Sequence, residues 1–245
     1  MKNLFLDSTC LQGKRVVING DQFHYLKNVR RLQEGSKLET IIGNKRYSLV
    51  VSSITKSRII CEIAAQRDIQ SNGWVPIYVY QGLLKSTKMD LVVSKLSELG
   101  VSEFFPMKTE RAIPEINTGI ERINRWKRLA TEGTKVSGFE KTMTIHAPVR
   151  FDRLENIIRQ EDHILFFSTL TRGNHIKNIL ESNRFAYNNS FHLLFGPEGG
   201  FSEDEIKMLL HLNATPVTLG DFVLKSETAS IVATGFIRLY YSDVI

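Results

Sequence analysis

Two short stretches of the chain are almost wholly apolar, and they constrain the fold more than any other feature. They are Ile164–Ser168 and Phe191–Phe195, each about as long as one strand and too short for a core helix. A strand that is apolar on both faces must be buried on both, as in a parallel sheet covered by helices. The sequence therefore predicts helices and a parallel sheet packed in layers around these two strands.

The same alternation of strands and helices extends over residues 73–245. Further strands are expected at Pro76–Gln81, Glu103–Met107 and Pro216–Leu219. Apolar residues at helical spacing predict helices from Met89 to a left-handed cap at Gly100, at Ile120–Lys135, after Phe201, and at Glu227–Tyr240. This part of the chain is expected to be an open α/β domain with a mainly parallel sheet.

The first third of the chain has a different pattern. Short runs that mix β-branched and polar residues predict strands at Lys14–Asn19, Lys37–Ile42, Lys45–Ile54 and Arg58–Ile63, with a hairpin turn at Gly43-Asn44. One helix is expected between the first two strands, capped by Asp21 and with an apolar stripe of Phe23, Leu26, Val29 and Leu32. Residues 1–72 therefore suit a small β-barrel with one helix, and Ile69–Val75 reads as a linker.

The net charge is distributed unevenly between these two parts. Residues 1–72 hold 12 of the 32 Lys and Arg residues but only 6 of the 26 Asp and Glu residues, so they carry the entire net charge of +6. Residues 73–245 hold 20 of each sign and are neutral. A basic module beside a neutral one favours contact with a polyanion such as nucleic acid. A small domain whose basic side chains are merely solvated is the alternative.

Several classes of protein are disfavoured by what the sequence lacks. No apolar run approaches the roughly 18 residues that span a bilayer, and the N-terminus has no signal-peptide pattern. The two cysteines, Cys10 and Cys61, are too few for a disulfide framework or a zinc site. No dinucleotide-binding fingerprint or P-loop is present, and the histidines do not form metal-ligand pairs. We expect a reduced cytoplasmic protein without a membrane or metal partner.

The strongest candidate for a ligand site is the loop Gly196–Gly200, which directly follows the apolar strand ending at Phe195. Open α/β sheets bind ligands beyond the carboxyl ends of their strands, and glycines let the backbone approach a ligand closely. Ser202 and Glu205 have the spacing of a capping box, which predicts a helix just after the loop. A tight strand-to-helix turn without a ligand is an equally good interpretation of these residues.

Two further loops follow expected strands. In residues 219–229, Ser226 can cap the next helix and Glu227 suits its N-terminal dipole. In residues 81–89, Lys85 and Lys88 are placed to meet phosphate. For either loop taken alone, an ordinary strand–loop–helix connection with solvated lysines is the favoured interpretation.

Taken together, three stretches resemble the signatures of a known family. They are GLLKSTKMDLVVSKLSELGV, LLFGPEGGFSEDE and VTLGDFVLKSETA, and they resemble the RsmE-like 16S rRNA (uridine-N3) methyltransferases of the SPOUT superfamily in order and spacing. The basic helix HYLKNVRRL, followed by Gly35, resembles the start of that family's PUA-like domain. The resemblance covers nearly the whole chain.

The resemblance implies a fold, a reaction and partners. The fold would be α/β, with an N-terminal PUA-like β-barrel in residues 1–72 and a C-terminal SPOUT domain in residues 73–245. The SPOUT domain would contain a deep trefoil knot, a rare exception to unknotted topology. The reaction would be methylation of uridine N3 in 16S rRNA of the small ribosomal subunit, with S-adenosylmethionine (SAM) as cofactor. The protein would be a homodimer with each SAM pocket near the subunit interface.

The resemblance also assigns candidate site residues. Those expected to bind SAM are Ser168, Thr169, Phe195, Gly196, Pro197, Glu198, Gly199, Gly200, Thr218, Leu219, Gly220, Phe222, Leu224 and Thr228. Those expected to contact RNA are His24, Arg30, Arg31, Lys85, Lys88 and Phe139. Because uridine N3 must lose a proton, Lys225 is the candidate to stabilise the anion. Glu198 and Glu227 are candidates to accept the proton or to orient the loops.

The chain departs from the family pattern at several positions that would face RNA. Val136 and Phe139 stand where Gln and Arg are usual, and Phe222 and Lys225 replace two further arginines. Arg makes bidentate phosphate contacts that Phe cannot make, although a Phe ring can stack on an unpaired base. Two alternatives therefore remain: a SPOUT methyltransferase with another RNA target, and an RNA-binding assembly factor without turnover.

Overall fold

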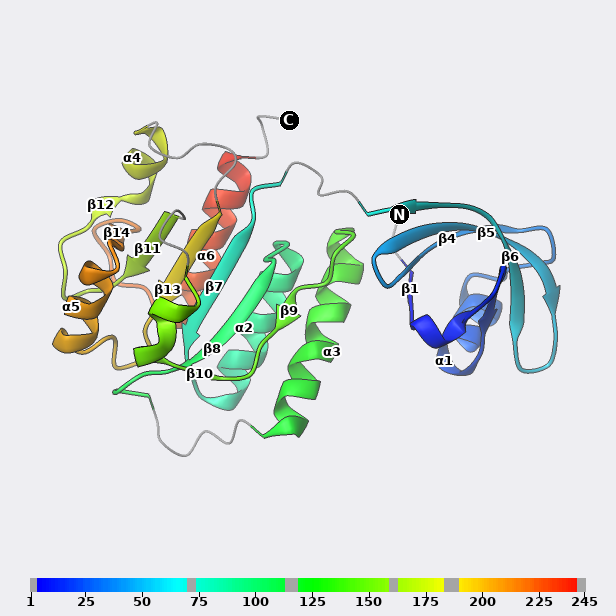
Figure 1. The fold of residues 1–245 in the computed structure, drawn as a ribbon, viewed down its shortest axis with the longest axis horizontal. Coiled ribbons are helices and arrows are strands. Elements are labelled where there is room, and N and C mark those ends of the chain that lie inside the picture. The colour runs from blue at the N-terminus through cyan, green and yellow to red at the C-terminus, as the bar shows by residue number, and fades with distance from the viewer. Residues whose placement is uncertain (1–3, 70–73, 113–118, 159–162, 183–189, 242–245) are drawn as a thin grey trace. The chain divides into compact units, whose positions relative to one another are not determined.

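The protein forms two compact units in a computed structural model that describes residues 4–69, 74–112, 119–158, 163–182 and 190–241 (Figure 1). The first unit comprises Met1–Ser71 together with Gly138–Lys141, and the second comprises Asn72–Ser137 and Thr142–Ile245. The chain therefore enters the first unit twice. Most of the expected linker, residues 70–73, lies outside the described residues.

The first unit is a curled sheet with the strand order β1-β4-β5-β6-β3-β2. Two register shifts between β5 and β6 bend this long antiparallel pair. The predicted hairpin turn is confirmed, because Gly43 has a φ of 60° between the antiparallel β4 and β5. The strands are β1 (Phe5–Leu6), β2 (Leu11–Gln12), β3 (Arg15–Ile18), β4 (Lys37–Ile42), β5 (Lys45–Ile54) and β6 (Ile59–Asp68), with a short 3-10 turn, η1 (Ser8–Cys10).

The expected helix of this unit is present but changes its pitch. A short α-helix, α1 (Gly20–His24), continues as a π-helix, η2 (Tyr25–Val29). Phe23 and Leu26 are buried as predicted, whereas Val29 is 67% exposed and does not belong to the apolar stripe. The wider π-turn rotates Val29 away from the core, because the three-residue spacing of the stripe assumes ordinary α-helical pitch.

Arg31, just after this helix, has a φ of 51°, in the left-handed region that disfavours side chains. We expect Arg31→Gly to raise the free energy of unfolding by about 0.5–1 kcal/mol, because glycine relieves this strain. Urea unfolding measures the change. Arg30 is the matched control: its φ of −82° is right-handed, so Arg30→Gly should lower stability. A destabilised Arg31→Gly variant would contradict the prediction.

The described residues of the second unit form an eight-stranded sheet in which every pairing is parallel, which confirms the predicted mainly parallel sheet. Its main order is β10-β8-β7-β13-β11-β14-β12, and β9 pairs with β8. The strands are β7 (Ile77–Gly82), β8 (Glu103–Lys108), β9 (Thr144–Ile145), β10 (Val149–Arg150), β11 (His163–Phe167), β12 (Asn174–His175), β13 (Phe191–Phe195) and β14 (Thr215–Thr218).

Helices cover both faces of this sheet (Figure 1). Each face of the sheet has its own hydrophobic core, and successive residues of a strand point into opposite cores. Val79 belongs to the core with the helices α2, α3 and α6, whereas Tyr80 belongs to the core with α5 and η3. The two cores explain why the central strands are apolar on both faces. The helices are α2 (Ser86–Glu98), α3 (Ile120–Ser137), the 3-10 helix η3 (Phe151–Asn156), α4 (Ile176–Glu181), α5 (Glu203–His211) and α6 (Ser226–Tyr240).

The helix ends agree with the sequence patterns only in part. Gly100 follows α2 with a φ of 69°, as predicted for a left-handed cap. The expected cap at Asp21 is wrong, because Asn19 precedes α1 and Asp21 lies inside its first turn. The expected cap at Ser226 is also wrong, because α6 already begins there and its hydroxyl bonds to another loop.

The remaining differences concern short elements. The sequence predicted none of the short helices η1, η3 and α4 and none of the two-residue strands β1, β2, β9, β10 and β12. Strand β6 continues to Asp68 rather than ending at Ile63. The α/β architecture, with a curled N-terminal sheet and a parallel C-terminal sheet, is confirmed. None of the described helices is both long and apolar enough to cross a membrane.

Candidate active site

A cavity of about 570 Å³ lies beyond the carboxyl ends of β11, β13 and β14. These strands are parallel neighbours, so the loops that follow them emerge at one edge of the sheet. The volume is within the range of cofactor and drug-sized sites. The lining residues are Lys88, Arg111, 167–170, 195–200, 217–219, 222–226 and Ala229.

The loop 196–200 forms one wall and turns back on itself. A Cβ atom on Gly196 would lie 2.9 Å from the carbonyl carbon of Gly200, and Gly200 has a φ of 69°. Directly afterwards, Ser202 and Glu205 form the predicted capping box at the start of α5. The backbone of this loop is therefore held in a tight conformation at the cavity.

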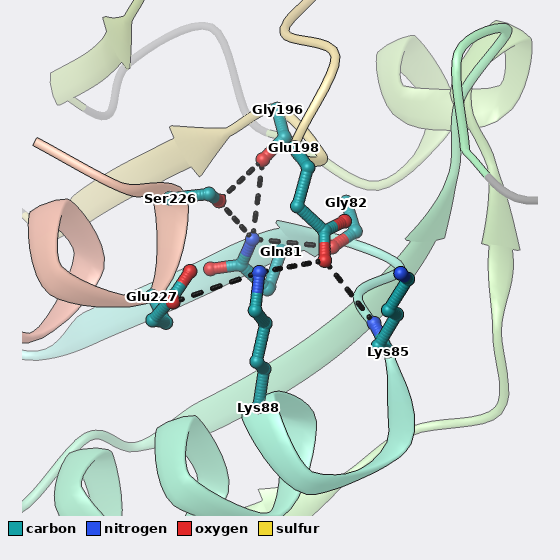
Figure 2. Close-up of polar contacts among 8 residues, drawn as sticks. All are labelled: Gln81, Gly82, Lys85, Lys88, Gly196, Glu198, Ser226 and Glu227. Carbon is teal, nitrogen blue, oxygen red and sulfur yellow. Dashed lines mark hydrogen bonds and ion pairs between the residues drawn. The ribbon is translucent and has the colours of Figure 1, made fainter.

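A buried glutamine joins this loop to the N-terminal end of α6 (Figure 2). The Gln81 side-chain amide donates to Ser226 Oγ at 2.8 Å and to the Gly196 carbonyl at 3.3 Å. Ser226 Oγ donates to the same carbonyl at 2.5 Å. Gly82 packs directly against the loop 196–200. A Cβ atom at this position would lie 2.5 Å from the backbone nitrogen of Pro197, so only glycine fits without a shift. Three segments far apart in the sequence are thus locked together.

Lys88 lies between two carboxylates on this side of the cavity (Figure 2). Its ammonium is 3.0 Å from Glu198 Oε1 and 3.7 Å from Glu227 Oε1. Glu227 is buried, and its second oxygen has no hydrogen-bond partner within the described part of the chain. Lys88 therefore provides the positive charge that balances Glu227. It also links α2 to the loop 196–200 and to the first turn of α6.

The same arrangement influences how these groups titrate. Burial alone would raise the pKa of Glu198, but hydrogen bonds from Lys88 and from backbone N–H groups, with the Lys88 charge, lower it overall. The hydrogen bond to Glu198 raises the pKa of Lys88. Glu198 is therefore ionised at neutral pH and is a weak base. This favours an orienting role for Glu198 over proton acceptance.

The rim of the cavity combines apolar side chains with a cation. Leu170, Phe222 and Val223 are 60%, 63% and 79% exposed and line the cavity. Lys225, also exposed, makes no ion pair or hydrogen bond through its side chain with any described residue. A free ammonium at the mouth is available to a negatively charged or electron-rich ligand.

The structure brings together nearly all residues expected to bind SAM. All of them line the cavity except Gly220 and Thr228. Gly220 lies just before the rim residue Phe222, and Thr228 lies in the first turn of α6. The hydroxyls of Ser168 and Thr218 bond within their own loops. These loops therefore present mainly backbone and apolar surface to the cavity.

The residues expected to contact RNA are distributed over both units. His24 and Arg31 are exposed, and Arg30 and Phe139 are partly buried, in the first unit. In the second unit Lys85 is exposed at the start of α2. Lys88, which was also expected to contact RNA, lines the cavity and pairs with Glu198 and Glu227.

Sequence reasoning missed Arg111 and several apolar lining residues. Arg111 follows β8, and its guanidinium donates to the carbonyls of Gly199 at 3.3 Å and Phe201 at 3.2 Å. The available signal was its position just beyond the carboxyl end of a parallel strand. The other missed lining residues are Phe167, Leu170 and Val217, whereas Val223, Ser226 and Ala229 belong to the candidate loop 219–229 but were not assigned to SAM.

Comparison with known families agrees with this site. A family model described as an RNA methyltransferase domain matches residues 71–238, which is more than half of the chain. The chain belongs to this RNA methyltransferase family. A second model, described as an RNA methyltransferase PUA domain, matches residues 18–64. Together the two matches span most of both structural units.

Similar proteins match over nearly their whole length. The ribosomal RNA small subunit methyltransferase E 2 of Borreliella burgdorferi is 28% identical, with 99% of each chain covered. The ribosomal RNA small subunit methyltransferase E of Aquifex aeolicus is also 28% identical, covering 88% of this chain and 90% of that one. Family membership and full-length similarity therefore agree.

Solved structures of similar fold cover the whole chain. The ribosomal RNA small subunit methyltransferase E of Neisseria gonorrhoeae, bound to S-adenosyl methionine, has a TM-score of 0.82 at 23% identity, with 100% of both chains covered. A probable rRNA-methyltransferase of Porphyromonas gingivalis has a TM-score of 0.84 at 22% identity, covering 99% and 100%. These similarities show that the fold is shared.

Proposed function

We propose that the chain is a SAM-dependent methyltransferase that modifies N3 of a uridine in 16S rRNA of the small ribosomal subunit. The observation that carries the proposal is the cavity built from three loops at the carboxyl edge of the parallel sheet. Membership of the RNA methyltransferase family supports the reaction class, and the names of the full-length relatives support the RNA substrate.

The residues present fit SAM. The cavity has the volume for a ligand of that size. Its wall combines glycine backbone at 196–200 with apolar side chains such as Leu219 and Leu224, which suits a molecule with a flat adenine and several polar groups. We propose that 168–169, 195–200, 218–221, Leu224 and Thr228 hold the cofactor. When bound, SAM supplies an electrophilic methyl group.

The chain's own residues then have to prepare the nucleophile. Uridine N3 carries a proton, which in this proposal passes to water at the exposed mouth of the cavity. Its loss leaves negative charge on the ring and its two carbonyl oxygens. Lys225 is an exposed cation at the cavity mouth that pairs with none of the described residues, and we propose that it stabilises this charge. Glu198 and Glu227, both paired with Lys88, hold the loops in position. Alignment of the reacting atoms is the main catalytic contribution of such a site.

The remaining assignments follow from the same proposal. Residues 1–72 would be a PUA-like domain that docks rRNA through His24, Arg30 and Arg31. Phe139, Lys85 and Lys88 would contribute further RNA contacts from residues 73–245. Residues 73–245 would be the SPOUT domain with its trefoil knot, and the protein would be a homodimer. Because its substrate is ribosomal RNA, the protein would act in the cytoplasm.

The proposal is tested with purified protein and unmodified small-subunit rRNA. The RNA is incubated with SAM carrying a deuterated methyl group, as free RNA and within reconstituted subunits, and then digested to nucleosides. Mass spectrometry against standards separates 3-methyluridine from uridines methylated at C5 or the 2′-hydroxyl. We expect labelled 3-methyluridine in at least one of the two substrates.

Other outcomes would select the alternatives. Label in another nucleoside, or only in a different RNA, would indicate a methyltransferase with another target. SAM binding without transfer, or no SAM binding at all, would indicate an RNA-binding assembly factor without turnover. Either result would overturn the uridine-N3 assignment.

A further inference from the structure

One aromatic ring is left exposed at the mouth of the cavity. Phe222 is 63% exposed and lines the cavity. Among the exposed large apolar side chains of the second unit's described residues, Phe222 is the aromatic one. An exposed phenyl ring forgoes the stabilisation that burial of its apolar surface would provide. A ring in this position therefore calls for an occupant that covers it.

The position of this ring is fixed by the loop that carries it. A Cβ atom on Gly220 would lie 2.8 Å from Phe222 Cε1, and Gly220 has a φ of 146° that few other residues adopt. The ring thus lies against the Gly220 backbone, where a side chain would displace it. Thr218 holds the same turn, because its hydroxyl donates to the Gly220 carbonyl at 2.8 Å. The ring is a preorganised surface rather than a loose side chain.

The surroundings of the ring suit a nucleotide. Lys225, three residues further along the same loop, is an exposed cation without a partner among the described residues. Leu170 and Val223 add exposed apolar surface to the same rim. An aromatic ring beside a free cation matches an unpaired nucleotide, whose base stacks while its phosphate or carbonyl oxygens meet the charge.

We propose that Phe222 stacks on a base of the RNA substrate, at or next to the target uridine, and so determines how tightly the unpaired strand is held. The inference rests on the proposed function, because it places the RNA at the mouth of the cavity that holds the cofactor. A base engaged in this way must leave its duplex, because the ring has to reach its face.

Two other occupants would leave different signatures. If the ring contacted adenine of SAM, its removal would weaken SAM binding. If it packed against a second copy of the chain, its removal would lower the oligomeric mass. The positive charge of Lys225 favours an RNA base over both of these occupants. SAM carries a positive sulfonium, and an apolar surface on a second copy of the chain would gain nothing from a nearby cation.

The first arm of the test is photochemical and needs no turnover. Small-subunit rRNA is transcribed with 5-iodouridine, bound to the protein, irradiated, and digested for mass spectrometry. We expect a uridine cross-link in the peptide that contains Phe222. A protein that binds this RNA but gives cross-links only elsewhere would overturn the inference.

The second arm compares variants. We expect Phe222→Ala to raise the KM for rRNA by about ten- to a hundredfold, with an unchanged dissociation constant for SAM and an unchanged oligomeric mass. Phe222→Tyr keeps an aromatic face and should retain affinity, whereas Phe222→Leu should not. Leu210→Ala is the matched control, because Leu210 is 48% exposed on α5 and does not line the cavity.

The arms separate this inference from the proposed function. A parent protein that neither binds SAM nor methylates rRNA would overturn the proposed function itself. A parent that methylates rRNA, with a Phe222→Ala variant of equal KM, would overturn the stacking alone. A weakened affinity for SAM or a lowered mass in Phe222→Ala would also overturn the stacking, in favour of the cofactor or a second copy.

Discussion

Lys88→Met is expected to weaken SAM binding by about ten- to a hundredfold. This range corresponds to the free energy lost when a hydrogen bond to a charged group is removed. Methionine keeps the length of the side chain but removes the charge that holds Glu198 and Glu227 together. Both carboxylates then repel each other, and the buried Glu227 has no compensating cation. The loop 196–200 and the start of α6 are expected to separate. Calorimetric titration with SAM measures the effect.

The matched control lies on the same helix. Lys95 pairs with Glu98 at 2.8 Å on the surface of α2, so Lys95→Met removes an ion pair without touching the cavity and should leave SAM affinity unchanged. In the double variant Lys88→Met with Glu198→Gln, the repulsion is relieved and part of the affinity should return. No recovery in the double variant would show that Lys88 acts other than through these charges.

Gly82→Ala is expected to have a comparable or larger effect from a single methyl group. The added Cβ atom would lie 2.5 Å from Pro197 N and 2.8 Å from the carbonyl carbon of Gly196, and backbone atoms cannot move aside as a flexible side chain can. Overpacking of this kind costs about 1–3 kcal/mol of stability. The displaced loop should also lose about a hundredfold in methyl-transfer rate, as for a misplacement of about 1 Å.

A second glycine provides a control substitution that is expected to raise stability rather than lower it. A Cβ atom on Gly235, within α6, would meet only Leu99 at 3.8 Å, an ordinary contact. Gly235→Ala should therefore stabilise the protein by up to about 1 kcal/mol through helix propensity, with methylation unaffected. Thermal unfolding and single-turnover methylation measure both variants. A Gly82→Ala variant with parental stability and rate would contradict the role of this close approach.

The parts of the fold that the sequence predicted are those set by local pattern. Strands apolar on both faces, such as Phe191–Phe195, can only be central in a layered sheet. The capping box at Ser202 and the left-handed Gly100 depend on neighbouring residues alone. By contrast, two-residue strands carry no periodicity, and the π-helix after His24 breaks the spacing on which Val29 was assigned.

The sequence predicted the parts of the site that are formed by loop backbone. It did not predict the side-chain contacts between residues that are far apart in the sequence. Glycine-rich loops after strands pointed to residues 196–200, because parallel strands bring their ends to one edge. The pairing of Lys88 with Glu198 and Glu227 joins residues more than a hundred positions apart, and spacing cannot show it. The hydroxyl of Ser226 was assigned to its own helix, but tertiary packing directs it to Gly196.

The most direct test of the account is the 3-methyluridine content of small-subunit rRNA from cells that lack this gene, measured by nucleoside mass spectrometry. We predict that 3-methyluridine is lost, that the parent gene restores it, and that the Gly82→Ala gene, expressed at the same level, does not. An unchanged 3-methyluridine content in cells lacking the gene would contradict the assigned reaction. Full restoration by Gly82→Ala would contradict the assigned site.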